Sequence, residues 1–135
     1  MRGTSIAVLR AGGQRFAVAG IHLDLFADAR LRHVHELHAA IDRHVPAEVP
    51  AVVAGDVNDV PDSAVWQALG ERGADAWLTN GNGTGYTYSA RQPRKRIDAV
   101  FADARFRIGS ARVLDGVDVE VASDHRPVLV ELELS

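Results

Sequence analysis

Four short polar motifs are spaced along this chain, and each accompanies an apolar run of the kind that forms a strand. Their aspartate, asparagine and histidine residues are the groups that hold a hard cation and move a proton at a phosphate. Strand ends can aim side chains from distant segments at one point, so we expect the motifs to converge. They are 20–23 (Gly-Ile-His-Leu), 55–58 (Gly-Asp-Val-Asn), 96–101 (Arg-Ile-Asp-Ala-Val-Phe) and 123–127 (Ser-Asp-His-Arg-Pro).

Asp56 and Asn58 form the strongest local signal, because they directly follow the continuously apolar segment 50–55. Side chains two residues apart point the same way along an extended chain. Asp56 can bind a metal or orient its water, and the Asn58 amide can donate to a phosphate oxygen. The pair alone fits equally well a turn that caps its own backbone. Its position beside the other motifs favours function.

The third and fourth motifs suggest a proton-transfer pair. His125 can accept a proton if a carboxylate fixes its tautomer, and Asp98 is the expected partner. Asp98 lies in an apolar strand, where an unpaired carboxylate is costly to bury. Alone, His125 is more simply a core histidine and Asp124 a surface carboxylate. His22 could donate to a leaving oxygen or bond a phosphate oxygen, although a surface histidine is the simpler interpretation.

Composition sets the broad class of the protein. Of its 135 residues, 47% are hydrophobic and 24% charged, which indicates a globular domain. The net charge of -3 does not favour a broad basic face for nucleic acid, although a cation site adds negative charge until the ion binds. Without cysteine, disulfides and thiolate chemistry are excluded. No membrane span or signal peptide is expected; the default location is cytoplasmic, and a processed secreted chain would look the same.

The elements that must position the motifs are predicted from hydrophobic periodicity. We expect one α/β domain over residues 1–135, with a mixed, mainly antiparallel sheet and two helices. Asp28 is predicted to cap the first helix, and Asp62 or Ser63 the second. The predicted strands cover 4–10, 15–22, 50–55, 86–88, 96–102, 105–114 and 127–134, the helices run from 28 to 44 and from about 62 to 70, and 79–85 is a loop.

The order of the four motifs resembles the endonuclease/exonuclease/phosphatase superfamily, which includes deoxyribonuclease I, AP endonucleases, sphingomyelinases and inositol phosphatases. The resemblance runs from about residue 3 to the end, and it is specific for the superfamily but not for the substrate. It implies that Asp56 orients the attacking water or contacts the metal, and that Asn58 holds a phosphate oxygen. It also implies that Asp98 pairs with His125, a base or phosphate contact.

Further residues receive roles from the same resemblance. Asp124 is placed in the metal shell together with Asp56, directly or through water. His22 matches the histidine of the deoxyribonuclease I and sphingomyelinase branches, which argues mildly against abasic-site repair. The cations Arg91, Arg94, Lys95 and Arg96 are either a solvated loop or an electrostatic guide for an anionic substrate. We therefore add Arg96 to Asn58 and His22 as predicted substrate contacts.

The resemblance also implies that this sequence is half of a domain. The superfamily fold is a four-layer αββα sandwich about twice as long, whose first half supplies an asparagine and the chief metal-binding glutamate. The chain matches the C-terminal half, with two helices on one face of its sheet. The other face would expose more apolar surface than monomers usually show. The chain is then a fragment, a homodimer joined through that face, or the partner of a polypeptide that supplies the first half.

The resulting prediction is a Mg²⁺- or Mn²⁺-dependent phosphoester hydrolase, phosphodiesterase- or nuclease-like, that is incomplete as this chain. Its partner is a phosphoester substrate, with nucleic acid among the candidates. Two alternatives stay open. One is a catalytically silent half-domain that acts by homodimerisation or by associating with a partner. The other is a sugar or lipid phosphatase.

Overall fold

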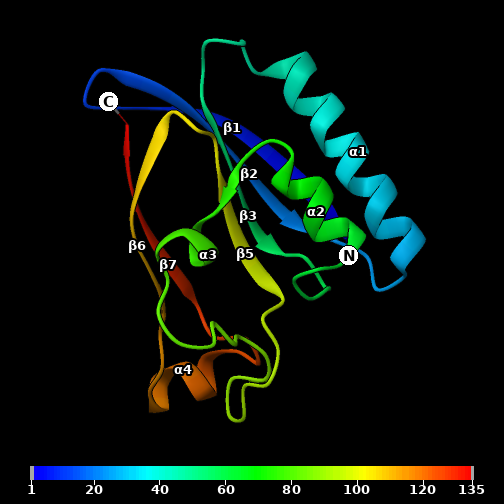
Figure 1. Cartoon of the computed structure of the whole chain (residues 1–135), viewed down its shortest axis with the longest axis vertical. Helices are drawn as coiled ribbons and strands as arrows, with labels where there is room; N and C mark the ends of the chain where they lie inside the picture. The colour runs from blue at the N-terminus through cyan, green and yellow to red at the C-terminus, as the bar shows by residue number, and fades with distance from the viewer. Residues whose placement is uncertain (1, 135) are drawn as a thin grey trace.

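The computed structural model describes residues 2–134 and is built on a mixed sheet (Figure 1). Its strands are arranged in the order β1-β2-β3-β5-β4, and only the β2–β3 pair is parallel within the described residues. This confirms the predicted mixed, mainly antiparallel sheet. The strands are β1 (Gly3–Ala11), β2 (Gln14–His22), β3 (Ala51–Asp56), β4 (Ala74–Asp75) and β5 (Asp98–Ala102).

Two helices cover one face of this sheet, as predicted. They are α1 (Ala27–His44) and α2 (Ala64–Gly70), which lie side by side in Figure 1. Between them and the sheet lies the core, where alternate residues of β2 meet the apolar face of α1. The core includes Ala17, Ala19, Ile21, Val34, Leu37, Ile41, Val53, Trp66, Leu69 and Phe101.

The opposite face of the sheet is partly covered by a second, two-stranded sheet that the sequence did not predict as separate. It consists of β6 (Phe106–Val113) and β7 (Val128–Leu134). Phe16 alternates in β2 with the core residue Ala17, and its ring meets Phe106 edge-on, with centroids 6.4 Å apart. The part of the second face beneath β6 and β7 is therefore covered by the chain itself.

Three local predictions differ from the structure or are sharpened by it. Asp28 lies in the first turn of α1 but does not cap it; Phe26 is the N-cap and makes no side-chain capping bond. Ser63 does cap α2, by accepting a hydrogen bond from Trp66 N at 3.2 Å. The predicted strand 86–88 contributes only isolated bridges at Tyr88. Two helices were missed, α3 (Ala76–Asn80) and α4 (Val117–Ala122), because they are too short for a periodic signal.

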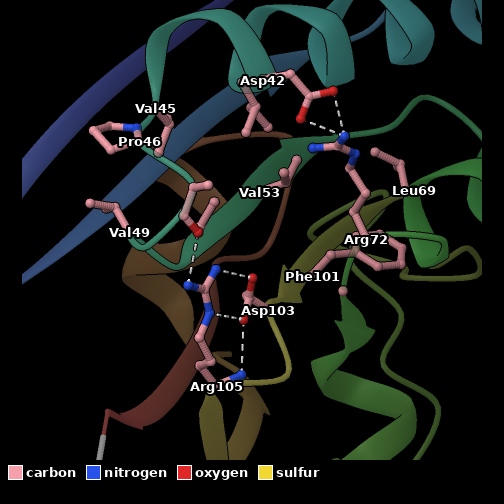
Figure 2. Close-up of a pocket in the computed structure, with 14 residues that line it drawn as sticks. Asp42, Val45, Pro46, Val49, Val53, Leu69, Arg72, Phe101, Asp103 and Arg105 are labelled. Carbon is pink, nitrogen blue, oxygen red and sulfur yellow. Dashed lines mark hydrogen bonds and ion pairs between the residues drawn. The ribbon is translucent and has the colours of Figure 1, made fainter.

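One end of the sheet lies near Ala51 and Asp103. A small pocket of about 220 Å³, lined by apolar and charged side chains, lies beside it (Figure 2). Two ion pairs flank it, Arg72 with Asp42 at 2.6 Å and Arg105 with Asp103 at 2.8 Å. We call this region the far end of the sheet, because the polar motifs lie at the other. No helix within residues 2–134 is long and apolar enough to cross a membrane.

Candidate active site

Three of the predicted residues are brought together by strand register. His22 is the register partner of Asp56 across the parallel β2–β3 pair, and Asp56 is the partner of Asp98 across the antiparallel β3–β5 pair. Residues in register lie at the same height on neighbouring strands and point to the same face. The three side chains therefore form a row at one end of the sheet, on the face that α1 and α2 leave uncovered.

The turn after β3 fixes the second motif. Gly55 has φ +143°, and a Cβ atom there would lie 2.0 Å from the carbonyl oxygen of Ile21, so only glycine fits before Asp56. Asn58 is left-handed, with φ +54°. Its backbone N–H donates to Asp56 Oδ1 at 2.8 Å, and its amide Nδ2 donates to the carbonyl of Leu23 at 2.9 Å. The amide is thus oriented, and its second hydrogen is available for another acceptor.

His125 reaches the row from the segment between α4 and β7. Its Nδ1 lies 2.8 Å from Asp98 Oδ2, and its Nε2 lies 3.9 Å from Asp56 Oδ2. A carboxylate at Nδ1 favours the tautomer in which Nε2 is free to accept a proton. The ring of Tyr88 packs against the imidazole, with centroids 5.0 Å apart. The predicted Asp98–His125 pair is therefore present as a hydrogen bond.

The charges in this row are incompletely balanced. Burial raises the pKa of Asp56, and the neighbouring Asp98 charge adds to that effect, against the lowering by the Asn58 N–H and the histidines. Burial lowers the pKa of His125, but its hydrogen bond to Asp98 and the surrounding carboxylate charges outweigh this and leave it raised. Both groups therefore bind a proton more tightly than the isolated side chains do.

His22 lies on the other side of Asp56 from this pair. Its Nε2 is 3.5 Å from Asp56 Oδ2, and the guanidinium of Arg2 contacts the same ring nitrogen. The side chain is 45% exposed, so it can meet a ligand from solvent. Asp56 therefore lies between two imidazoles, one of which is tied to a second carboxylate.

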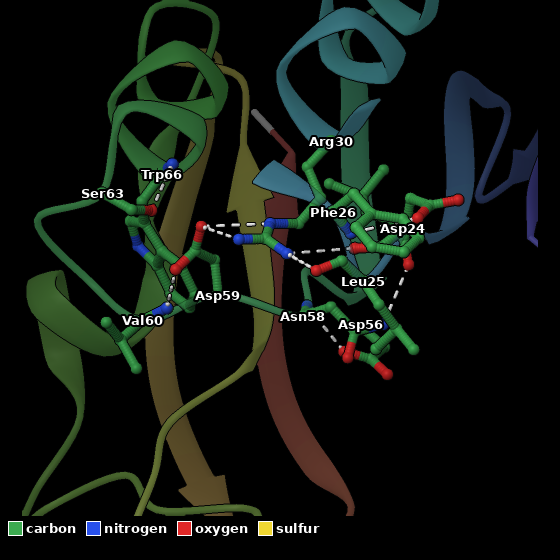
Figure 3. Close-up of polar contacts among 11 residues, drawn as sticks. Asp24, Leu25, Phe26, Arg30, Asp56, Asn58, Asp59, Val60, Ser63 and Trp66 are labelled. Carbon is green, nitrogen blue, oxygen red and sulfur yellow. Dashed lines mark hydrogen bonds and ion pairs between the residues drawn. The ribbon is translucent and has the colours of Figure 1, made fainter. Parts of the chain in front are cut away.

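Arg30 holds the two loops that carry the site, and sequence reasoning missed it (Figure 3). From α1, its guanidinium donates to Asp59 at 2.8 and 3.1 Å and to the carbonyls of Asp24 and Leu25 at 3.3 and 2.6 Å. It thereby joins the loop after β2 to the loop that contains Asn58. The signal available in the sequence was an arginine on the apolar face of an amphipathic helix, which demands a buried acceptor.

Arg96 is not part of this arrangement. It is buried, forms an ion pair with Asp75 at 2.9 Å, and stacks its guanidinium 4.8 Å from the centre of the Trp66 ring. The structure therefore does not bring Arg96, a predicted substrate contact, to the other site residues; its side chain packs in the framework of the fold. Asp124, in contrast, lies at the site with its backbone oxygen bonded to Ala90 N.

The assembled residues surround a hollow of about 660 Å³. Ligand atoms of Asp56, Asp98 and His125 lie within 4.8 Å of one another, a spacing and donor set that suit a divalent cation. The hollow joins all the predicted site residues except Arg96, and adds Arg2, Leu25, Tyr88, Lys95 and Ile97.

Comparisons with known proteins identify the family of this chain and the structures that share its fold. The model of the endonuclease/exonuclease/phosphatase family matches residues 2–125. None of the curated proteins matches the chain. Among solved structures, an endonuclease/exonuclease/phosphatase from Bacteroides vulgatus is 26% identical with a TM-score of 0.87, over 99% of this chain and 56% of that one. One from Beutenbergia cavernae is 28% identical with a TM-score of 0.72, over 98% of this chain and 39% of the other.

A mannosyl-6-phosphatase from Bacteroides thetaiotaomicron shares the fold, with 21% identity and a TM-score of 0.83. The match covers 98% of this chain and 57% of that phosphatase. The chain thus spans little more than half the length of most of these structures.

Proposed function

Because the chain belongs to the endonuclease/exonuclease/phosphatase family, we propose that it is a divalent-metal-dependent phosphoester hydrolase module, phosphodiesterase- or nuclease-like. The observation that carries this proposal is the 2.8 Å bond between His125 and Asp98, which aims the free imidazole nitrogen toward Asp56. A base, a carboxylate and an oriented amide at one hollow are the parts that phosphoester hydrolysis requires.

The chain's own residues divide the reaction between them. His125 Nε2 accepts a proton from the attacking water while Asp98 stabilises the imidazolium that forms. Asp56 orients that water, and the second hydrogen of the Asn58 amide donates to a phosphate oxygen. His22, on the far side of Asp56, donates a proton to the leaving oxygen. This assignment needs the two imidazoles to act in opposite senses, one as base and one as acid.

A divalent cation fits this site. Asp56 would hold Mg²⁺ or Mn²⁺ together with Asp124, which lines the same hollow. Asp98 and His125, whose ligand atoms lie within 4.8 Å of that of Asp56, would keep their mutual hydrogen bond and thereby the His125 tautomer. When bound, such an ion neutralises charge that develops on the phosphate oxygens. Burial, and to a lesser extent the charge of Asp98, raises the pKa of Asp56, and a bound cation would offset both effects.

We propose that the chain corresponds to the C-terminal half of the family domain, and that a complete site draws further ligands from another segment. The shares of 56% and 57% covered in two relatives support this. The same shares support the alternative of a silent half-domain that acts by association, through a homodimer or with another polypeptide. The name of the mannosyl-6-phosphatase supports a sugar phosphate as the alternative substrate.

Turnover measurements separate these possibilities. Bis-p-nitrophenyl phosphate and mannose 6-phosphate are incubated with the chain in Mg²⁺ and in Mn²⁺. Because a complete site needs further ligands, we expect slow hydrolysis of the diester by the chain alone, lowered at least 100-fold by His125→Ala or Asn58→Ala. His35→Ala, on the exposed face of α1, is the matched control and keeps wild-type activity.

Wild-type turnover in the His125→Ala protein would contradict the site assignment. Hydrolysis of the monoester alone would favour the sugar phosphatase. Metal binding by calorimetry without turnover of either ester would favour the silent half-domain.

A further inference from the structure

The segment 88–95 folds back on itself beside the hollow. Tyr88 and Lys95 form the closing pair, with each backbone N–H donating to the other residue's carbonyl at 3.1 Å. The Arg94 N–H adds a bond to the Tyr88 carbonyl at 2.8 Å. We call this segment the basic hairpin, because it carries Arg91, Arg94 and Lys95.

The basic hairpin is bonded through its backbone to the segment that carries the proposed base. Tyr88 forms a bridge with His125, and Ala90 N donates to the carbonyl of Asp124 at 2.7 Å. Arg126 completes the attachment, because its Nε donates to the carbonyl of Ala90 at 2.7 Å. The hairpin is therefore held in a fixed position relative to the site.

Within the part of the chain that the structure describes, the three cations of the hairpin lack the carboxylate partners that most arginines near the sheet have. Arg91, Arg94 and Lys95 are exposed, and none forms an ion pair with any residue in the described range 2–134. Arg72 and Arg105, by contrast, each face an aspartate. Positive charge without a partner, beside a site for phosphate, raises the local concentration of polyanions.

The hairpin also reaches into the hollow. Lys95 and Tyr88 both line it, and Arg91 and Arg94 lie on the same hairpin outside that lining. Tyr88 is 39% exposed, which leaves part of its ring open to a ligand. An exposed aromatic ring beside cations is the combination that proteins use to bind unpaired nucleotides, through base stacking and phosphate contacts.

We propose that the basic hairpin binds phosphates of the substrate that flank the one cleaved, and that the substrate is a single nucleic-acid strand. This rests on the proposed function for the position of the scissile phosphate. A sugar monophosphate offers no second phosphate, so it would leave the cations unused. The net charge of -3 agrees with a short local contact rather than a broad basic face.

The test is binding of a fluorescein-labelled eight-nucleotide oligothymidylate, followed by anisotropy in EDTA so that no hydrolysis occurs. The triple variant Arg91→Gln/Arg94→Gln/Lys95→Gln is compared with Arg10→Gln/Arg32→Gln/Arg43→Gln. The control triple removes the same charge from exposed positions on β1 and α1 that form no ion pair within residues 2–134.

We expect the hairpin variant to bind at least tenfold more weakly, and its salt slope to fall by about 2, since each lost phosphate contact on a single strand contributes about 0.7. The control triple should stay within about twofold of wild type. Equal weakening by both triples would show a net-charge effect only and overturn the proposal. Unchanged binding by the hairpin variant would overturn it as well.

Hydrolysis of bis-p-nitrophenyl phosphate separates this inference from the proposed function. This small diester has no flanking phosphate, so the double variant Arg91→Gln/Arg94→Gln, which keeps Lys95 in the lining of the hollow, should hydrolyse it at the wild-type rate. Turnover with no hairpin effect on oligonucleotide binding would overturn the inference alone. Selective loss of binding in a protein that hydrolyses nothing would overturn the proposed function and leave the nucleic-acid site standing.

Discussion

The two ends of the central sheet differ in how their carboxylates are paired. At the far end, Asp103 receives hydrogen bonds from Arg105, which hold the pKa of Asp103 below its usual range. At the site end, Asp56 has no arginine partner among the described residues; it faces a second carboxylate and two imidazoles, and burial raises its pKa. The same strands thus join a region where charges are matched to one where they are not.

This difference indicates which end has a function beyond stability. An ion pair at the surface satisfies its own charges and needs no ligand. A row of acceptors on partly buried strand ends is unfavourable by itself and becomes favourable when a cation or proton arrives. We therefore place the proposed binding function at the site end and treat the small pocket at the far end as an ordinary feature of the fold.

The strongest way to test the comparison uses two Arg–Asp pairs that differ in burial. Arg30 and Asp59 join the site loops with side chains only 11% and 20% exposed, whereas Arg72 and Asp42 are 39% and 60% exposed. Arg30→Met leaves a partly buried carboxylate unpaired and should lower the free energy of unfolding by about 3–5 kcal/mol. Arg72→Met should lower it by about 0–1 kcal/mol. Urea unfolding measures the free energy of unfolding of each variant. Equal losses of stability would contradict the proposal that Arg30 holds the two site loops together.

A second prediction concerns the hydrogen bond that prepares His125. Asp98→Asn removes the negative charge that stabilises the imidazolium, so the pKa of His125 should fall. In the wild-type protein this raised pKa adds stability that is present below pH 6.5 and is lost as the pH rises through the folded-state value. NMR titration of the His125 ring without metal measures the change. Asp42→Asn, at the far end, is the control; a similar fall there would refute a specific Asp98 effect.

The smallest expected effects are changes in fold stability caused by Asp→Asn substitutions, and they have opposite signs at the two ends of the sheet. Because the pKa of Asp56 is raised in the folded state, ionisation of this carboxyl lowers the free energy of unfolding as the pH rises above 3.8. Asp56→Asn should therefore stabilise the fold at pH 7 by up to about 1 kcal/mol. The lowered pKa of Asp103 means stability that is present above pH 3.8 and lost on acidification. Asp103→Asn should therefore destabilise the fold at pH 7, by at most about 1 kcal/mol. Thermal unfolding at pH 7 measures the stability change of each variant. A change of the same sign in both variants would contradict the proposed difference between the two ends of the sheet.

The sequence predicted the parts of this molecule that depend on local pattern. Periodicity predicted α1 and six of the strands but not β4, and the residue types predicted the Asp98–His125 pair. The prediction of convergence succeeded because His22, Asp56 and Asp98 each lie at a strand end, where register alone brings them together.

The parts that were missed depend on contacts between distant segments. Arg96 looked like a member of a basic loop, but its partner Asp75 lies 21 residues earlier and turns it into the interior. Arg30 lies on the apolar face of α1, which signals a buried acceptor, but that acceptor, Asp59, is 29 residues away and could not be identified from the sequence. The separate β6–β7 sheet was missed for a similar reason, since hydrophobic alternation predicts strands but not which sheet they join.

The most direct measurement maps where the chain binds a divalent cation. Mn²⁺ is titrated into ¹⁵N-labelled protein, and paramagnetic broadening of each backbone amide is recorded. The account predicts that broadening begins at Asp56, Asp98, Asp124 and His125, and that amides beside Asp42 and Asp103 stay sharp because arginines already occupy those carboxylates. Broadening spread evenly over acidic surfaces, or strongest at the far end, would contradict the claim that the polar motifs form one cation site.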